Sequence, residues 1–512
     1  MRILGVADHP WQSEMISEIF NELDEKKVSS FVGTIVLADY YTPYHAPELI
    51  DNWRKDYPWT YHHMGDLYKS WQNPHKHLNL DQVEGFLGSW MEKNLPKENY
   101  CYFIKRNQYV NSYERSVYYQ KTPLCCQKQI LADTILWIED IFTRERFDVV
   151  LGIERYTMLV SIIEVISQRK GLTYLKAIPS RIENRWFVTA DSGVGMNPEM
   201  YEKMKLYKHE DDCKQRALAF IDNMQNQKVG LYARWKSGAY EFSIEPSDPI
   251  KSGQDFLFGD MRNVLIHGAK AIYSRLFIHS RKLQYRTRIL DEKRIVMSAF
   301  EVIILLKKLL RSLGFKMWGN ATPEIERDFY LWCLHYRPEG STLVLSDGVD
   351  ELEVISSVAK KLPLGSFLYV KENPAMFGMR SRKFYKAIHR IPNVIFVDAF
   401  CSTSTLLLNC KGVIGLSGTI LLEALAYGKK SICLGKPEFD LVLPFRGFEQ
   451  LDYFFNDEES HNSLRQRFIE YFCFAKSITT GNYAGENSPI KLPETQCLIK
   501  ELSQEFQRLI TP

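Results

Sequence analysis

Residues 412–437, GVIGLSGTILLEALAYGKKSICLGKP, decide the fold expected for this chain. An apolar strand runs to Leu416, the polar turn Ser417, Gly418 and Thr419 follows, and an apolar helical pattern begins at once. A helix start has unpaired N–H groups, glycine admits an anion close to the backbone, and two hydroxyls add donors. The turn therefore suits a bound phosphate, although a Ser or Thr helix cap beside a tight glycine turn explains the same residues equally well.

The alternation of strand and helix extends over the surrounding residues 331–434. The predicted strands are Leu331–His335, Phe367–Lys371, Val394–Val397, Gly412–Leu416 and Ser431–Leu434. The predicted helices are Val349–Lys361, Arg382–His389, Thr403–Cys410 and Thr419–Tyr427. Such an alternation is typical of a doubly wound parallel α/β domain.

The N-terminal half begins with the same pattern. Strands are predicted at residues 2–7, 30–38, 147–153 and 174–178, and helices at residues 13–25 and 157–169. Between the strands at 30–38 and 147–153, residues 42–125 are rich in Tyr, Trp, Pro and His and have weak periodicity. This predicts an insertion or helical excursion, and the sequence pattern does not indicate its topology.

The expected fold class is therefore α/β, with two Rossmann-like doubly wound domains that face a cleft and with a helical insertion. At 512 residues the chain is too long for one ordinary core. The expected units are an N-terminal domain at 1–320 with insertions at about 42–125 and 200–316, a C-terminal domain at 321–490, and a helix at 491–512 that could cross back to the first domain.

The composition is that of a globular protein, with 45% hydrophobic and 25% charged residues. No apolar run reaches the roughly 18 residues of a membrane span, and the N-terminus has no long apolar core of a signal peptide. We therefore expect a cytoplasmic protein. The ten cysteines are scattered without a CxxC pair, which favours buried free thiols over metal ligands or disulfides.

Charge is unevenly distributed along the chain. Residues 261–316 contain thirteen Lys and Arg against three Asp and Glu, so this basic segment is +10 and the rest of the +3 chain is −7. Its helical spacing fits a solvated helix face, or a surface that contacts anionic lipid at the inner face of the membrane or a charged glycan. A nucleic-acid partner is not expected, because no aromatic-interleaved basic motif or zinc spacing accompanies the charge.

Polar side chains follow the predicted strands of the C-terminal half. His335, Arg337 and Glu339 follow the first of these strands, and Lys371 and Asn373 end or follow the next. The cations can neutralise a phosphate, and the histidine or glutamate can transfer a proton or hold a sugar. Because ligands of such sheets bind at the carboxyl ends of the strands, these residues and the glycine turn predict one polar rim.

Glu423 stands four residues after Thr419, on the same helix face, and interrupts an otherwise apolar helix. Its carboxylate can accept hydrogen bonds from ribose hydroxyls, or it is an ordinary helical glutamate. In the N-terminal half, candidate acids and bases follow the strands: Glu154 is preferred, with Asp8, His9 and Asp191 behind it. A surface ion pair explains Glu154 about as well. Arg181 and Arg185 can bind an anionic acceptor.

Five stretches, in order, resemble the bacterial capsule and surface polysaccharide biosynthesis family, whose best understood members transfer Kdo or related sugars from nucleotide-activated donors. They are LHYRPEGST, LYVKENP, GMRSRKFY, PNVIFVD and GLSGTILLEALAYGKKSICLGKPEF. The resemblance covers roughly residues 325–440. VVLGIERY and IPSRIENRWFVTAD match more loosely.

The resemblance implies a GT-B glycosyltransferase that needs no metal and no cofactor. It also implies that the N-terminal domain, 1–320, binds the acceptor and that the C-terminal domain, 321–490, binds the nucleotide sugar. By this likeness, Ser417, Gly418 and Thr419 would hold the donor phosphate, Glu423 the ribose, and His335, Arg337 and Glu339 the donor pocket. Many relatives have His-Pro where this chain has Asn373-Pro374. Asparagine donates a hydrogen bond but carries no proton at neutral pH, so this position departs from the family pattern.

The function expected from these observations is transfer of a sugar from a nucleotide-activated donor, such as one like CMP-Kdo, onto a capsule or surface polysaccharide. The expected partners are the nucleotide sugar and a glycan or lipid-linked acceptor. The expected catalytic residues are Glu154, Asp8 and His335. Two alternatives are open: a nucleotide-sugar epimerase, and a non-catalytic nucleotide-binding subunit of a polysaccharide assembly complex.

Overall fold

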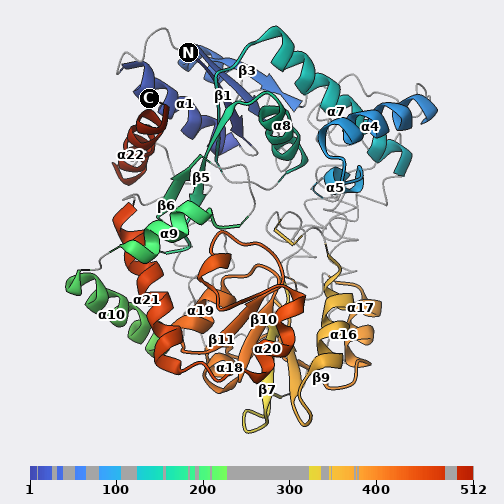
Figure 1. Ribbon diagram of the computed structural model, residues 1–512, viewed down its shortest axis with the longest axis vertical. Coiled ribbons are helices and arrows are strands. Elements are labelled where there is room, and N and C mark those ends of the chain that lie inside the picture. The colour runs from blue at the N-terminus through green and yellow to red at the C-terminus, as the bar shows by residue number, and fades with distance from the viewer. Residues whose placement is uncertain are drawn as a thin grey trace, which may run out of the picture.

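The computed structural model of the chain contains two separate β-sheets, each covered by helices (Figure 1). The residues that the structure describes are 1–7, 10–25, 32–37, 52–64, 80–104, 106, 124–153, 157–182, 185–190, 195–207, 210–227, 322–335, 345–346, 349–373, 376, 380–478 and 493–510.

The first sheet has the strand order β3-β2-β1-β4-β5-β6. Its strands are β1 (Arg2–Ala7), β2 (Val32–Leu37), β3 (Thr60–His63), β4 (Val149–Ile153), β5 (Thr173–Pro179) and β6 (Trp186–Thr189). All neighbours are parallel except β5 and β6, which are antiparallel. In the centre, Val6 pairs with Val36 of β2 and Gly152 of β4.

Helices cover both faces of this sheet, because successive side chains of a buried strand point to opposite faces. Ile3 belongs to a cluster under α1 (Pro10–Glu25) and α22 (Pro493–Ile510). Leu4 belongs to the opposite cluster, which is covered by α4 (Leu80–Asn94), α5 (Cys101–Ile104), α7 (Leu124–Arg144) and α8 (Met158–Arg169).

Helix α22, at the C-terminal end, packs against α1 of the first sheet (Figure 1). Leu498, Ile499, Leu502 and Phe506 recur at intervals of one, three and four residues and are fully buried in the cluster with Ile3. This spacing places them on one stripe of the helix. Helix α22 therefore forms part of the hydrophobic core that covers one face of the first sheet.

The second sheet has the strand order β12-β11-β10-β7-β8-β9, and all its described neighbours are parallel. Its strands are β7 (Phe329–Cys333), β8 (Phe367–Lys371), β9 (Val394–Val397), β10 (Gly412–Gly415), β11 (Lys430–Cys433) and β12 (Phe445–Arg446). One face packs against α16 (Glu351–Lys361), α17 (Arg382–His389) and α20 (Leu451–Asn456). The other face packs against α18 (Thr403–Asn409), α19 (Ile420–Ala426) and α21 (His461–Ile478). Two short 3₁₀ turns, Asp440–Val442 and Phe448–Gln450, flank β12.

Both sheets run in the order third, second, first, fourth, fifth, sixth strand. This order, with helices on both faces, is that of the doubly wound nucleotide-binding folds. The predicted α/β fold class with two Rossmann-like halves is confirmed.

The two sheets are joined by packing as well as by the chain. Helices α9 (Pro198–Leu206) and α10 (Asp211–Gln227) lie against α21 (Figure 1). Phe187 of β6 packs with Tyr471 and Phe474 of α21, and the Tyr471 hydroxyl donates to the carbonyl oxygen of Ser180 at 2.7 Å. One apolar cluster therefore contains residues of both sheets.

The strand bounds differ little from those expected, but three described edge strands were not predicted. Residues 60–63 form β3 inside the aromatic segment 42–125, residues 186–189 form the antiparallel β6, and residues 445–446 form β12. β3 and β6 have four residues each and β12 has two, which is too short for a period-two pattern to stand out. The basic segment 261–316 lies outside the described residues.

Candidate functional site

The winding of the second sheet reverses between β7 and β10. From β7 the chain continues to β8 and β9 on one side and then returns to form β10, β11 and β12 on the other. Segments that follow β7 and β10 therefore leave in opposite directions, and open α/β sheets bind ligands at such a point. His335 stands two residues after β7, and Ser417 stands two residues after β10.

The turn from Ser417 to Thr419 links β10 directly to α19. Thr419 already has helical backbone angles, and its side chain makes no capping hydrogen bond within the described part of the chain. Its carbonyl oxygen accepts from the N–H groups of Leu422 and Glu423 at 3.0 and 2.9 Å. The hydroxyl is thus not used as a helix cap, which was the simplest structural explanation for a threonine at this position.

His335 and Gly418 bring the ends of β7 and β10 into contact. A Cβ atom at Gly418 would lie 3.3 Å from Cε1 of His335, tighter than an ordinary contact. The imidazole therefore packs on the backbone of the glycine turn, and a larger residue at 418 requires the ring to move. The structure thus brings two of the predicted site elements together at the switch point.

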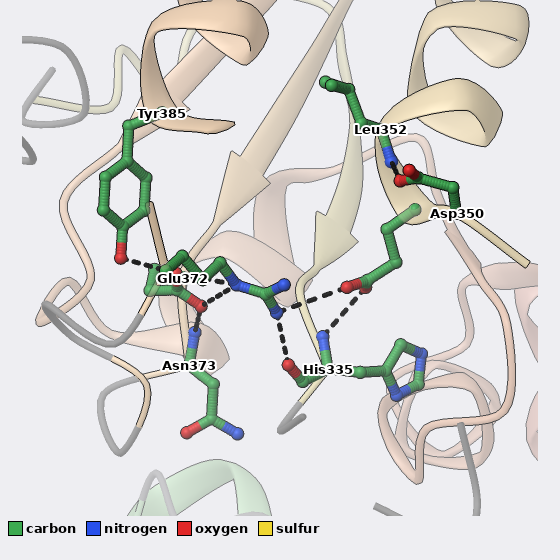
Figure 2. A network of polar contacts seen from close by, with 8 residues as sticks. His335, Asp350, Leu352, Glu372, Asn373 and Tyr385 are labelled. Atoms are coloured by element: carbon green, nitrogen blue, oxygen red, sulfur yellow. Dashed lines mark hydrogen bonds and ion pairs between the residues drawn. The ribbon is translucent and has the colours of Figure 1, made fainter. Parts of the chain in front are cut away.

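A buried ion-pair network holds the main chain of His335. The Arg380 Nη2 group donates to the His335 carbonyl oxygen at 2.5 Å and lies 3.2 Å from Oε2 of Glu351. The other oxygen of Glu351 accepts from the His335 N–H at 3.0 Å. The two polar main-chain atoms of this residue are therefore both bound by one ion pair (Figure 2).

The same guanidinium binds a second carboxylate, that of Glu372, which directly follows β8. Arg380 Nε lies 3.0 and 3.3 Å from its two oxygens. Glu372 also accepts from the Asn373 N–H at 2.9 Å and from the Tyr385 hydroxyl at 3.2 Å (Figure 2). Burial raises the pKa of Glu372, and the neighbouring Glu351 carboxylate raises it as well, while Arg380 lowers it. We name Glu351, Glu372, Arg380 and Tyr385 the arginine network.

The arginine network was not predicted from the sequence. Glu372 and Arg380 both stand in stretches that mark the family resemblance, and a charged residue directly after the apolar run FLYVK is a visible signal. Glu351 has no such signal, because it stands at the start of an amphipathic helix where a carboxylate is common. The partners of these charges are decided by the packing of α16 and α17.

Lys371, a predicted phosphate ligand, is buried at the end of β8. Its Nζ donates to the carbonyl oxygen of Ala399 at 2.7 Å, and its own carbonyl accepts from the Leu334 N–H at 2.8 Å. The charge lies close enough to lower the pKa of the Cys333 thiol, although burial raises that pKa overall. The lysine thus joins the β7, β8 and β9 ends, and its role toward a phosphate stays a prediction.

The remaining predicted residues of the second sheet have different positions. Glu423 is buried on α19. Burial raises the pKa of Cys333 on β7, and the charge of Glu423 acts in the same direction. Asn373 is partly buried, with its side chain pointing away from the arginine network (Figure 2). Arg337 and Glu339 lie outside the described residues.

The predicted catalytic carboxylates, Asp8 and Glu154, lie outside the described residues, as do His9 and Asp191. The strands that precede Asp8 and Glu154, β1 and β4, are hydrogen-bonded neighbours at the switch point of the first sheet.

Arg181, predicted as an acceptor ligand, has a positive φ of 66°. Its guanidinium donates to Oε1 of Glu438, in the segment after β11, at 2.9 Å. Nearby, the Met196 N–H donates to the Asp440 carboxylate at 2.8 Å. The arginine thus links the first half of the chain to the second. The main chain of Arg185 closes the same turn by accepting from the Ser180 N–H at 2.7 Å.

The described residues contain no group of three or more His, Cys, Asp and Glu side chains that could hold a metal ion. None of the helices in the described ranges has the length and apolar character needed to cross a membrane.

The fold and the site define a class: a doubly wound α/β protein whose polar residues gather at the switch point of the second sheet, where nucleotides bind in such folds. Residues 345–446 match the family model "Capsule polysaccharide biosynthesis protein". The family resemblance predicted from the sequence is confirmed for this segment. It contains most of the site, including Glu372, Arg380 and the turn at Ser417.

Solved structures that match the chain include two KpsC proteins of Thermosulfurimonas dismutans, described as a beta Kdo 2,4 and a beta Kdo 2,7 transferase. They are 14% and 12% identical, cover 64% and 66% of this chain and 79% of each of theirs, and have TM-scores of 0.31 and 0.33. A UDP-GlcNAc 2-epimerase of Neisseria meningitidis, bound to UDP-GlcNAc, is 10% identical, covers 100% of this chain and 99% of its own, and has a TM-score of 0.27. No curated protein matches the chain.

Proposed function

We propose that this protein is a GT-B glycosyltransferase that moves a sugar from a nucleotide-activated donor, such as one like CMP-Kdo, onto a bacterial capsule or surface polysaccharide. The observation that carries the proposal is the meeting of His335 with the Ser417–Thr419 turn at the switch point of the second sheet. The turn lies within the segment 345–446 that matches the capsule family. Nucleotide phosphates bind at such points because glycine turns and helix starts present N–H donors.

In this proposal the donor lies over the carboxyl ends of β7, β8 and β10. The hydroxyls of Ser417 and Thr419 donate to the phosphate, and the Thr419 hydroxyl is not engaged as a helix cap. Glu423 accepts from the ribose hydroxyls. The His335 ring and the Asn373 amide contact the donor on the β7 and β8 side, where their main chains are held by the arginine network.

The proposed reaction is a displacement at the anomeric carbon of the donor sugar. A hydroxyl oxygen of the acceptor forms the new glycosidic bond, while the bond from the anomeric carbon to the phosphate oxygen breaks and the nucleotide leaves with the electron pair. Donors from the protein, and no metal, neutralise the negative charge on the leaving phosphate. His335 can supply one of these donors, because a protonated imidazole carries positive charge near neutral pH.

The acceptor proton is proposed to go to a carboxylate of the first sheet. Glu154 is the preferred base and Asp8 the second candidate, because β1 and β4 end side by side at the switch point of that sheet. Removing a positioned base lowers turnover by a factor of about 10² to 10⁴. Glu154→Gln is therefore expected to reduce turnover by that factor and to leave donor affinity near normal. If the variant keeps wild-type turnover, the base is instead Asp8, His9 or Asp191.

The first experiment is a thermal-shift screen with CMP, UDP, GDP and their sugar conjugates, because a ligand that binds only the folded state raises the melting temperature. The nucleotide with the largest shift is then measured by calorimetry against Thr419→Ala. Loss of one charge-assisted hydrogen bond should weaken binding by about 1–2 kcal/mol.

Thr403→Ala is the matched control, since Thr403 is the first residue of α18, the helix that follows the outermost strand β9. It should leave binding unchanged. Equal affinity of the Thr419→Ala protein and the wild type would remove the turn from the donor site.

Turnover separates the proposal from its alternatives. A transferase consumes the donor only when a capsule oligosaccharide acceptor is present, apart from slow hydrolysis. An epimerase changes the sugar of the donor without an acceptor. A nucleotide that binds without any turnover would favour a non-catalytic subunit, which Asn373 at the family histidine position suggests because an amide transfers no proton.

We also propose that the basic segment 261–316 contacts an anionic membrane surface or a lipid-linked acceptor at the cytoplasmic face. Its net charge of +10, from thirteen cations and three anions, supports this. The attraction should fade with added salt, because charges are screened over about 8 Å at physiological ionic strength. Equal flotation with neutral and anionic vesicles would contradict it.

A further inference from the structure

The arginine network connects parts of the chain that are distant in sequence but adjacent at the switch point. Glu351 begins α16, Glu372 follows β8, Arg380 precedes α17, and Tyr385 lies on α17. All four side chains are buried. The network therefore lies between the helices of one face and the ends of the two strands that bear His335 and Asn373.

The network binds main-chain atoms of both site residues. His335 is held at its N–H by Glu351 and at its carbonyl by Arg380, and Asn373 is held at its N–H by Glu372. Figure 2 shows that the side chains of His335 and Asn373 both point away from the network. The ion pairs thus fix the main-chain positions of His335 and Asn373, from which the two side chains project away from the network.

The network is built from buried charges, which argues against a purely stabilising role. One guanidinium faces two carboxylates, both fully buried. Apolar residues of similar volume often stabilise a fold as well as, or better than, a buried ion pair, because desolvating the charges is unfavourable. What an apolar core cannot do is bind three main-chain polar groups of two neighbouring loops in fixed positions.

We propose that Arg380 is a positioning residue of the donor site, which through Glu351 and Glu372 sets the main chains of His335 and Asn373 at the switch point. This rests on the proposed function for the identity of the ligand. Arg380 acts through other residues, and contact of its own with the donor is not part of the proposal. The planar fork of arginine is required, since it binds two carboxylates and one carbonyl at once.

Arg380→Lys is the decisive variant, because lysine keeps the positive charge but presents it as a single ammonium group. The matched control is Arg169→Lys. Arg169 also binds a carboxylate with two hydrogen bonds, of 2.8 and 2.6 Å to Glu139, but it joins α8 to α7 beside the first sheet. Tyr385→Phe is a milder third variant that removes one hydroxyl donor to Glu372.

Two measurements are made on the full-length protein. The first is amide hydrogen exchange at residues 335 and 373, which needs no ligand. The second is the affinity for the nucleotide among CMP, UDP and GDP that gives the wild type its largest thermal shift. Affinities are measured at the same interval below the melting temperature of each variant, so that a general loss of stability does not enter the comparison.

In Arg380→Lys we expect exchange at both amides to accelerate at least tenfold relative to β10, and nucleotide affinity to fall about tenfold. Tyr385→Phe should give smaller changes in the same direction. Arg169→Lys should lower the melting temperature slightly and leave both readouts at wild-type values. A folded Arg380→Lys protein with unchanged exchange at residues 335 and 373, or with unchanged nucleotide affinity, overturns the inference.

Failure of the proposed function has a different signature. If the wild type binds none of the nucleotides, the donor site is wrong. The exchange arm still decides whether Arg380 holds the two main chains: unchanged exchange overturns this part as well, and accelerated exchange supports it for whatever ligand the switch point binds.

Discussion

Arg380 and Arg169 each bind a glutamate through two short contacts, but burial reverses the effect on the carboxylate. Arg380 is 3% exposed and its partners Glu372 and Glu351 are 0% exposed, whereas Arg169 and Glu139 are 28% and 25% exposed. Desolvation raises the pKa of Glu372 in spite of Arg380. At Glu139 desolvation also acts to raise the pKa, but hydrogen bonds from Arg169 and Trp90 outweigh it and the pKa is lowered. The degree of burial, more than the ion pair itself, decides whether the pKa of the paired carboxylate is raised or lowered.

The largest effect is expected for Arg380→Met. Removing the guanidinium leaves two buried carboxylates without their cation, and breaking a buried pair in this way typically lowers the free energy of unfolding by 3–5 kcal/mol, roughly. Chemical denaturation measures the loss. The combined variant with Glu351→Gln and Glu372→Gln should recover a large part of it, because the uncompensated charges are then gone. A loss below about 1 kcal/mol in the single variant would show that the buried ion pair of Arg380 contributes no more than an exposed pair does.

An intermediate effect is expected for the ion pair between Arg181 and Glu438, whose side chains are 14% and 7% exposed. Arg181→Met should lower the free energy of unfolding by about 2 kcal/mol, since it leaves a mostly buried carboxylate without this partner. Arg181→Gly should be about 1 kcal/mol less damaging, because glycine accepts the positive φ of 66° without strain. If the glycine variant is the less stable of the two, backbone strain at 181 is not significant.

A smaller, pH-dependent effect is expected for Glu139→Gln. The lowered pKa of Glu139 means that its ionised form stabilises the folded state at pH values above its usual 4.5, and that this contribution is lost as the pH falls through the lower, folded-state value. At pH 7 the variant should lose up to about 1 kcal/mol, reduced by solvent screening at this partly exposed site. Thermal unfolding from pH 7 to pH 3 should narrow the difference between variant and wild type, and a constant difference would contradict the prediction.

The smallest effect is expected for Arg216→Gln on α10. Arg216 pairs with Asp212 at 2.8 Å, but the side chains are 66% and 68% exposed. Exposed pairs of this spacing contribute less than about 0.5 kcal/mol, and glutamine has a similar helix propensity to arginine. Urea denaturation should find variant and wild type nearly equal in stability. A loss of stability comparable to that of Arg181→Met would show that burial does not set the order of the four effects.

The site was predicted in part because its elements are local. A strand, a glycine turn and a helix at residues 412–427 are read directly from the order of apolar and polar residues, and the structure has them within a residue or two. The edge strand β3 was not predicted, since residues 60–63 pair with β2 across a long aromatic segment without a periodic pattern of their own.

The sequence by itself determined that strands and helices alternate in two halves of the chain and that polar residues follow the strands, because hydrophobic periodicity and turn residues act over short distances. Only the tertiary structure decided that β10 returns beside β7, so that His335 meets Gly418, and that Arg380 binds Glu351 and Glu372. Burial of those charges depends on how α16 and α17 pack on the sheet. The presence of a charged residue in a sequence does not indicate whether its side chain will lie in water or between two helices. That difference decides how much the charge contributes to the free energy of folding.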